Sequence, residues 1–186
     1  FGGFFLTLLG KGFLRELYKS FAFRDYGLLR VLLDDNNNVI GFASGTTEPE
    51  IFYKRLRKER GFTFFCKAIP GLLRNPFLVI KKLWYALFYK GEKPSGILNA
   101  ALLSSIAVLP DESGKSYGKK LLMDYESTVK KIGCESLYLT TDKSGNDGII
   151  SFYKRNGYSV ESEFIQADGR EMLTLMKKLV GANDEQ

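Results

Sequence analysis

A glycine-containing loop holds the residues of this sequence that could bind an anion. Gly114 and Gly118 lie between an apolar run and an amphipathic stretch, and Lys115 and Lys119 stand beside them. Backbone amides at the start of a helix are unpaired and partly positive, and glycine lets the main chain approach a ligand closely. The loop is therefore a candidate phosphate or pyrophosphate site. A solvated strand-to-helix connection would contain the same residue types, so the loop alone leaves both interpretations open.

The composition excludes several kinds of catalysis. The 186 residues include no histidine, which rules out Ser-His-Asp and Cys-His catalysis and histidine-containing zinc sites. Any acid or base must therefore be Tyr, Asp, Glu, Lys or Cys. The loop has neither the glycine spacing of a Walker A motif nor the three glycines of a Rossmann fingerprint, which disfavours ATP and NAD. Cys66 and Cys134 lie far apart in apolar-rich segments, so we expect two buried free thiols, no metal and a cytoplasmic location.

The pattern of apolar residues predicts a single α/β (α+β) domain over residues 1–180 and a frayed tail over 181–186. A charge-free apolar run over 98–109 predicts a buried central strand that leads into the loop. The stripe over 117–131, closed by Gly133, predicts the helix that follows the loop. The other predicted elements are a helix or broken helix pair over 4–18, a hairpin of 27–34 and 39–44, a strand over 136–141, a helix over 147–155, and strands over 158–165 and 171–179.

Residues 49–93 form a predicted helical insert of unusual charge. Ten Lys and Arg residues but a single acid, Glu59, lie between positions 53 and 90. We expect helix breaks near Gly61, at Pro70 and at Pro76. Aromatic residues alternate with the cations, which suits either a lid over an anionic acceptor or a surface that rests on an anionic membrane. Helices packed on the core with a solvated basic face would give the same pattern.

The loop resembles the acetyl-CoA loop of the GNAT superfamily of N-acetyltransferases. The run Val108-Leu109-Pro110, followed by Gly118 and a leucine-rich helix, is similar to the superfamily pattern. Two positions depart from it. Ser113 stands where Arg or Gln is usual, and Ser116 stands where a glycine is usual.

A second segment, over residues 146–158, is similar to the superfamily's Asn-x-x-Ala-x-x-Phe-Tyr-x-x-x-Gly-Phe motif. Asn146, Phe152-Tyr153 and Gly157 match it, and Tyr158 replaces the last Phe. Together the two motifs imply a central mixed, mostly antiparallel sheet flanked by helices, with acetyl-CoA as co-substrate. The N-terminal segment also resembles bacterial members of the superfamily associated with small molecules and surface polysaccharides.

The resemblance assigns roles to individual residues. It implies that Tyr153 protonates the departing thiolate and that Asn146 contacts the CoA arm near the thiol. The other implied cofactor-binding residues are Ile106, Ala107 and Val108 for the pantetheine arm, and Ser113, Gly114, Lys115, Ser116, Tyr117, Gly118 and Lys119 for the pyrophosphate. Tyr153 could instead be a core aromatic, because it and Phe152 are adjacent on a helix and only one of them can face the core squarely.

The general base and the acceptor remain open at the level of the sequence. Glu48 and Glu50 are candidate bases, although a solvated turn beside a helix start is the commoner place for such residues. The expected acceptor is a primary amine of a small molecule, such as an amino sugar or a nucleotide-linked sugar. The alternative is a non-catalytic binding module that engages an anionic partner or membrane through the insert. Nucleic-acid binding is not expected, and the oligomeric state is left open, with a homodimer as one option.

Overall fold

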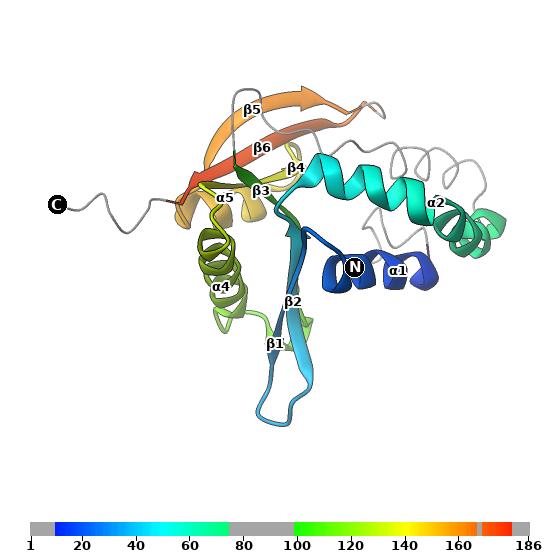
Figure 1. Ribbon diagram of the computed structural model, residues 1–186. Helices are drawn as coiled ribbons and strands as arrows, with labels where there is room; N and C mark the ends of the chain where they lie inside the picture. Colours follow the sequence, from blue (N-terminus) through cyan, green and yellow to red (C-terminus); the bar gives the residue numbers. More distant parts are fainter. Residues whose placement is uncertain (1–9, 75–98, 167–168, 180–186) are drawn as a thin grey trace.

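The computed structural model describes residues 10–74, 99–166 and 169–179 of the chain. Within them, helices are interspersed among strands, and β1–β2 and β5–β6 are consecutive pairs of strands (Figure 1). The elements are α1 (Lys11–Phe23), β1 (Gly27–Leu33), β2 (Val39–Thr46), α2 (Pro49–Arg74), β3 (Ala100–Val108), the 3₁₀ turn η2 (Pro110–Glu112), α4 (Tyr117–Lys131), β4 (Ser136–Asp142), α5 (Asp147–Arg155), β5 (Ser159–Ile165) and β6 (Glu171–Lys178).

The strands form one sheet of six, in the order β1-β2-β3-β4-β6-β5. Every neighbouring pair is antiparallel except β3 and β4, which run parallel. Helices α1 and α2 lie on one side of the sheet, and α4 and α5 lie on the other (Figure 1). The predicted fold class, a mixed and mostly antiparallel sheet flanked by helices, is therefore confirmed.

Each face of the sheet has its own hydrophobic core. On one face, α1 and α2 pack against Ala100, Leu102 and Tyr138 of the central strands. On the other face, α4 and α5 pack against alternate residues of the same strands, including Leu103 and Leu137. Because successive side chains of a strand point to opposite faces, the apolar runs of β3 and β4 supply both cores.

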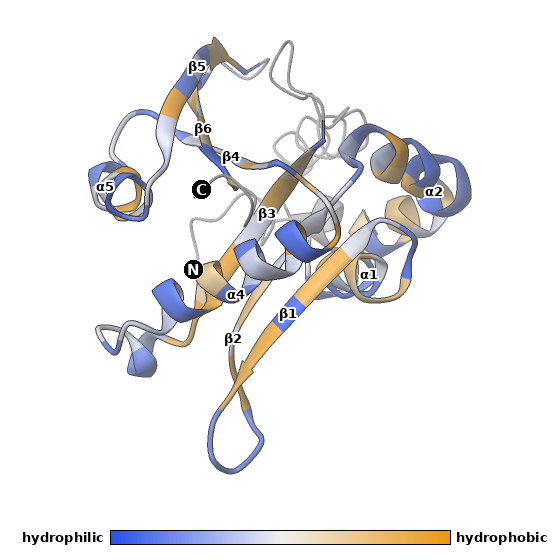
Figure 2. Cartoon of the chain, turned by 60° about the vertical axis from the view of Figure 1, so that its left-hand side comes forward, coloured by the Kyte–Doolittle hydropathy of each residue, from blue (hydrophilic) through white to orange (hydrophobic). Residues whose placement is uncertain are grey.

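The β1–β2 hairpin has apolar strands and a polar turn (Figure 2). Its two strands carry mostly apolar side chains, and hydrophilic residues occupy the turn between them. In that turn, the Asp34 carboxylate accepts backbone hydrogen bonds from Asn36 and Asn38, and Asn37 adopts a positive φ of 63°. Short polar side chains that bond to their own backbone are the residues expected at such a turn.

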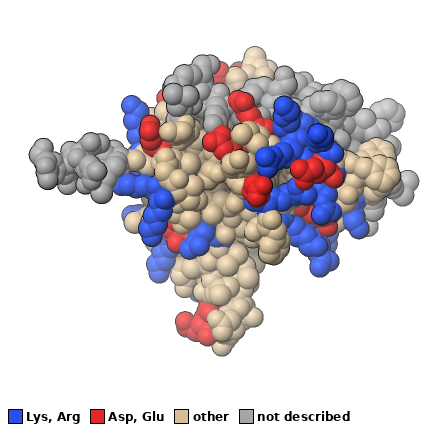
Figure 3. Space-filling view, in the orientation of Figure 1, with Lys and Arg blue, Asp and Glu red and all other residues tan. Residues whose placement is uncertain are grey.

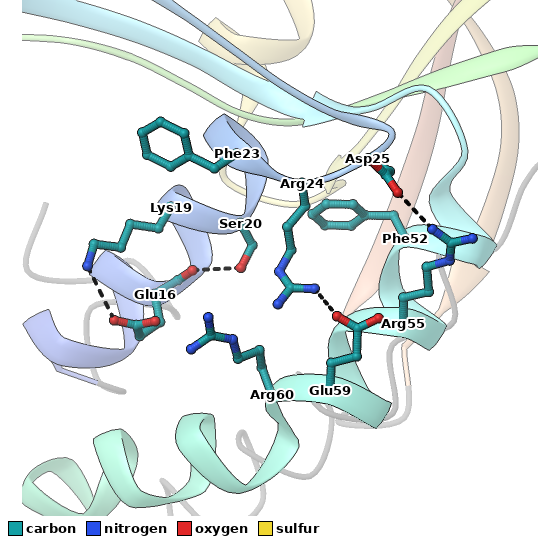
Figure 4. A pocket seen from close by; sticks show the side chains of 10 residues that line it. All are labelled: Glu16, Lys19, Ser20, Phe23, Arg24, Asp25, Phe52, Arg55, Glu59 and Arg60. Atoms are coloured by element: carbon teal, nitrogen blue, oxygen red, sulfur yellow. Dashed lines mark hydrogen bonds and ion pairs between the residues drawn. The ribbon is translucent and has the colours of Figure 1, made fainter.

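The structure corrects the prediction that the insert is broken near Gly61 and Pro70. Helix α2 is continuous from Pro49 to Arg74, and residues 75–93 of the predicted insert lie outside the described residues. Glycine weakens a helix interior by only about 1 kcal/mol, and tertiary burial of an apolar stripe readily outweighs that amount. The stripe consists here of Leu56, Phe64 and Ala68, all buried. The ribbon changes direction close to Arg60, next to the glycine (Figure 4).

Two smaller predictions also need correction. Helix α1 runs over Lys11–Phe23 and so ends beyond residue 18, because Phe13, Leu17 and Phe21 continue the buried stripe at four-residue spacing. Residues 4–9 of the predicted helix lie outside the described residues. Both cysteines are free, as expected, but Cys66 is only half-buried whereas Cys134 is buried.

Among the described helices, none combines the length and the apolar character needed to cross a membrane.

Gly45 of β2 is the glycine whose replacement the fold tolerates least. An added Cβ would lie 1.9 Å from the carbonyl oxygen of Leu102 and 2.5 Å from the hydroxyl of Tyr125. We expect Gly45→Ala to lower the free energy of unfolding by about 3 kcal/mol or more, because the Leu102 carbonyl cannot yield without moving the backbone of β3. Chemical denaturation would measure this change.

Gly61→Ala is the matched control for that experiment. No atom lies within 4 Å of the added Cβ at position 61, in the middle of α2. The free energy of unfolding should therefore rise by about 0.5–1 kcal/mol, the helix-propensity difference between the two residues. Equal effects of the two substitutions would contradict the packing described for β2 and β3.

Candidate functional site

Strands β3 and β4 separate soon after they begin, and this leaves a gap in the middle of the sheet. Their parallel pairing covers three residue pairs, from Ala100 with Ser136 to Leu102 with Tyr138. Beyond Leu102, β3 remains paired with β2 as far as Val108 but is no longer paired with β4. Backbone groups on that side of β3 therefore need another partner, and an extended ligand with amide groups could supply one.

The residues predicted to hold the pantetheine arm lie along this separated part of β3. Ile106, Ala107 and Val108 are half-buried, whereas the first four residues of the strand are buried. Ile106 and Val108 also pack against the core beneath α4. The backbone of all three residues is thus fixed by β2 and by the core while one edge of the strand stays free.

The loop after β3 presents a series of unpaired backbone amides. Leu109 leads into η2, Gly114 has a φ of 82°, and Ser116 precedes α4 with a φ of 61°. Within the described residues, the amides of residues 114–119 donate no hydrogen bond to the protein, and that of Lys120 donates to the Ser116 carbonyl. These consecutive amides lie at the start of α4, and the start of a helix is a place where an anion binds favourably.

Ser113 does not share this arrangement, contrary to the prediction. Its amide donates a hydrogen bond of 3.0 Å to the carbonyl of Pro110 and closes the 3₁₀ turn. The amide is therefore not free for a pyrophosphate. The positive φ of Ser116, by contrast, explains why a glycine would be the usual residue at that position, because an L-residue is strained there.

The lysines of the loop differ in their partners. Lys115 forms an ion pair of 2.9 Å with Glu112, and the hydrogen bond to that carboxylate raises the pKa of Lys115. The ammonium group of Lys120 lies 5.2 Å from the centre of the Tyr117 ring. In the described part of the chain, Lys119 has no carboxylate within ion-pair distance. Lys119 is thus the cation of this loop that is least engaged elsewhere.

Helix α5 brings the second sequence motif next to the loop. A Cβ on Gly118 would lie 3.9 Å from the ring of Phe152, so the two motifs meet at the start of α4. Asn146 precedes α5 and donates hydrogen bonds to the Thr141 hydroxyl, at 2.5 Å, and to the Asp142 carbonyl, at 3.4 Å. It therefore lies at the end of β4 that has separated from β3.

Tyr153 faces the core of α5 and the sheet. Its ring is 5.2 Å from that of Phe152 and 5.3 Å from that of Tyr158, measured between centroids, and the residue is 5% exposed. Burial raises the pKa of the Tyr153 phenol above its usual value. The interpretation of Tyr153 as a core aromatic is thus correct for its ring, and the phenol stays protonated at neutral pH.

A match to a family model agrees with this geometry. Residues 81–158 match the model described as the acetyltransferase (GNAT) family, and this range includes β3, the loop, α4, β4 and α5. Over this range the chain is therefore similar to the GNAT acetyltransferase family. No curated protein sequence matches the chain significantly. The groups of His, Cys, Asp and Glu that a metal would need are absent from the described residues.

Solved structures share the fold at low sequence identity. The NatC complex bound to Gag peptide and CoA is 13% identical, with a TM-score of 0.57, and the match covers 89% of this chain and 79% of that one. The ribosomal-protein-S18-alanine N-acetyltransferase from Escherichia coli is 16% identical, with a TM-score of 0.53 and coverage of 92% and 80%. A GNAT-family protein described as an acetyltransferase from Desulfovibrio desulfuricans is 15% identical, with a TM-score of 0.51 and coverage of 82% and 68%.

The family match and the GNAT fold together support an acetyl-CoA-dependent N-acetyltransferase. Acetyl-CoA as the co-substrate, which the resemblance implied, agrees with this match and with the CoA named for the NatC structure. The individual roles of the GNAT site residues stay predictions. What the structure adds is their arrangement, because the free edge of β3, the unpaired amides and α5 lie in one continuous region.

The face of β3 that is turned to α2 carries hydroxyl groups that sequence reasoning did not select. The register between β2 and β3 shifts after Ser44, which leaves Ser104 opposite no residue of β2. The Ser104 hydroxyl lies 3.4 Å from that of Tyr53, and burial raises the pKa of Tyr53 to about 12. The hydroxyls of Ser44 and Ser105 are buried without a partner in the described chain. The sequence feature that could have indicated these hydroxyl groups is the presence of serines in an otherwise apolar strand.

The two predicted bases, Glu48 and Glu50, lie at the start of α2 and differ in their surroundings. Glu50 is exposed in the first turn of α2. The pKa of Tyr138, the last β4 residue paired with β3, is raised by burial, by Tyr53 and also by the negative charge of Glu50. Glu48 is half-buried, and its amide is bound to the Thr46 hydroxyl. The role of either carboxylate as a base stays a prediction.

Gly118 tests whether the start of α4 binds the CoA pyrophosphate. An added Cβ would meet only the Phe152 ring at an ordinary 3.9 Å, so Gly118→Ala should fold at least as stably as the parent. The same Cβ would stand among the free amides and hold an anion away from them. We expect acetyl-CoA to raise the Tm of the parent clearly and that of Gly118→Ala much less. An equal rise in both would show that the pyrophosphate binds elsewhere.

Proposed function

We propose that this chain transfers the acetyl group of acetyl-CoA directly to the primary amine of a small molecule. The observation that carries the proposal is the continuity between the free edge of β3 and the unpaired amides of residues 114–119. A pantetheine arm has amide groups suited to a strand edge, and a pyrophosphate suits a helix start. The thioester then lies near the point where β3 leaves β4, beside α5.

In the proposed reaction, the neutral amine nitrogen attacks the thioester carbon, and the carbon–sulfur bond breaks. The thiolate takes the proton of the Tyr153 hydroxyl, and the nitrogen loses a proton that restores Tyr153 by way of water. The Tyr153 phenol is protonated at neutral pH and can therefore donate a proton, but its raised pKa lowers the driving force for transfer to the thiolate. Alignment of amine and thioester supplies much of the rate in such a transfer.

The acceptor in this proposal approaches from the side of β3 turned to α2. The buried hydroxyls of Ser44 and Ser105, which have no partner in the described chain, and those of Ser104 and Tyr53 place polar groups beneath a largely apolar wall on this side. Lys and Arg side chains, with some acidic ones among them, gather over α2 on the face shown in Figure 3. The exposed cations of α2 include Lys54, Arg55 and Lys58. Hydroxyl groups and nearby cations favour an amino sugar, and within that class a nucleotide-linked one.

A panel of amines would test the proposed activity. The chain would be mixed with acetyl-CoA and, separately, with an amino sugar, a nucleotide-linked amino sugar, a polyamine and a peptide with a free N-terminus. We expect release of free CoA thiol above the background of hydrolysis, and fastest release with the nucleotide-linked amino sugar. Fastest release with the peptide would keep the reaction but reject the proposed acceptor class.

The same assay distinguishes an enzyme from a non-catalytic binding module. A module that keeps the fold would bind acetyl-CoA and release no thiol with any amine. The exposed basic face of α2 is the feature that such a module would use to engage an anionic partner. Release of thiol with any member of the panel would reject the module.

Tyr153→Phe tests the proposed proton donor. The substitution keeps the buried ring and removes only the hydroxyl, so we expect kcat to fall by about 10²-fold or more, within the range of general acid catalysis, and CoA affinity to stay the same. Tyr26→Phe is the control, because this tyrosine lies next to Arg55 and remote from β4 and α5. An unchanged kcat in Tyr153→Phe would remove the phenol from the mechanism.

A further inference from the structure

One arginine occupies a position on α2 where an apolar residue is expected. Leu56, Arg60, Phe64 and Ala68 follow one another at four-residue spacing, which places them on one face of the helix. Leu56, Phe64 and Ala68 are buried against α1 and the sheet, yet Arg60 between them is exposed. The face of α2 is therefore open to solvent at Arg60, between buried residues on both sides.

Arg60 is exposed because a cavity opens between α1 and α2 at this point. The cavity has a volume of about 530 Å³, which is in the range of small-molecule sites. Figure 4 shows Arg60 pointing from α2 towards α1, into the space between Glu16 and Arg24.

The residues that line the cavity include one more cation than carboxylates. Glu16 pairs with Lys19 at 3.8 Å, and Asp25 pairs with Arg55 at 3.0 Å. Glu59 forms a close ion pair with Arg24. These three pairs account for every carboxylate of the lining, and within the described chain Arg60 has no carboxylate at ion-pair distance.

The cavity is separate from the acetyl-CoA site. Its inner wall is the ring of Phe52, which stacks on Phe21 with 5.0 Å between the centroids and 7° between the planes. Both residues are almost fully buried, so the stack closes the cavity towards the sheet. Phe23, which is 85% exposed, lies at the rim. None of the lining residues belongs to β3, β4 or α5.

We propose that this cavity is a second binding site, which takes a small organic carboxylate through the guanidinium group of Arg60. A guanidinium group binds a carboxylate with two parallel hydrogen bonds, and the Phe52 and Phe23 rings suit an apolar or aromatic body. A single negative charge balances the unpaired Arg60. A second one would be repelled by Glu16 and Glu59, which disfavours phosphate monoesters.

The test uses benzoate as the probe, with the whole chain followed by NMR titration. Benzamide has the same shape without the charge, and phenyl phosphate has the ring with a second negative charge. We expect benzoate to shift signals of α1 and α2 saturably, phenyl phosphate to bind more weakly, and benzamide not to bind at the same concentrations. Benzamide binding equal to that of benzoate, or phenyl phosphate binding tighter than benzoate, would overturn the proposal.

Substitutions at Arg60 assign the site. Arg60→Gln should weaken benzoate binding by about tenfold or more, since a charge-assisted pair is lost, and Arg60→Lys should weaken it less. Lys58→Gln removes an exposed cation that does not line the cavity, and benzoate binding should not change. Acetyl-CoA should bind all three variants like the parent, which shows that they fold and separates this proposal from acetyl transfer. Unchanged benzoate binding in Arg60→Gln would overturn the proposal.

Discussion

The short parallel pairing of β3 with β4 is the constraint on which the rest of the site depends. Because only three residue pairs join these strands, β3 continues with one edge free as far as Val108. The loop of free amides follows directly from that edge, and α5 follows from the separated end of β4. A longer pairing would close the gap, and the amides at the start of α4 would no longer be continuous with a free strand edge in the middle of the sheet.

The two cores hold β3 in place although it lacks a partner on one side. Tyr125 of α4 donates a hydrogen bond of 3.2 Å to the carbonyl of Leu102, the last residue paired with β4. Gly45 of β2 allows the backbones to approach at the same level. Packing from both faces therefore fixes the point at which the strands separate, and this rigidity positions the groups that a thioester and an amine would meet.

Much of the fold could be predicted from the sequence because its elements have strong local signals. Helices α4 and α5 have a clear apolar stripe and a glycine after the end, and their bounds agree with the prediction. The continuity of α2 could not be predicted, since it depends on burial against α1. The bond that occupies the Ser113 amide, the contact between Tyr53 and Ser104, and the cavity around Arg60 also arise from packing between segments distant in sequence.

The gap between β3 and β4 divides the sheet into two units of three strands, β1-β2-β3 and β4-β6-β5. Among the described residues, and apart from the side chains of the two cores, these units are joined by three residue pairs and by hydrogen bonds between Asn99 and Glu135, directly before the two strands. In the proposed reaction, a co-substrate seated in the gap would touch both units and act as a removable cross-link between them. Its departure after each turnover would then remove contacts between the two halves of the sheet as well as release a product.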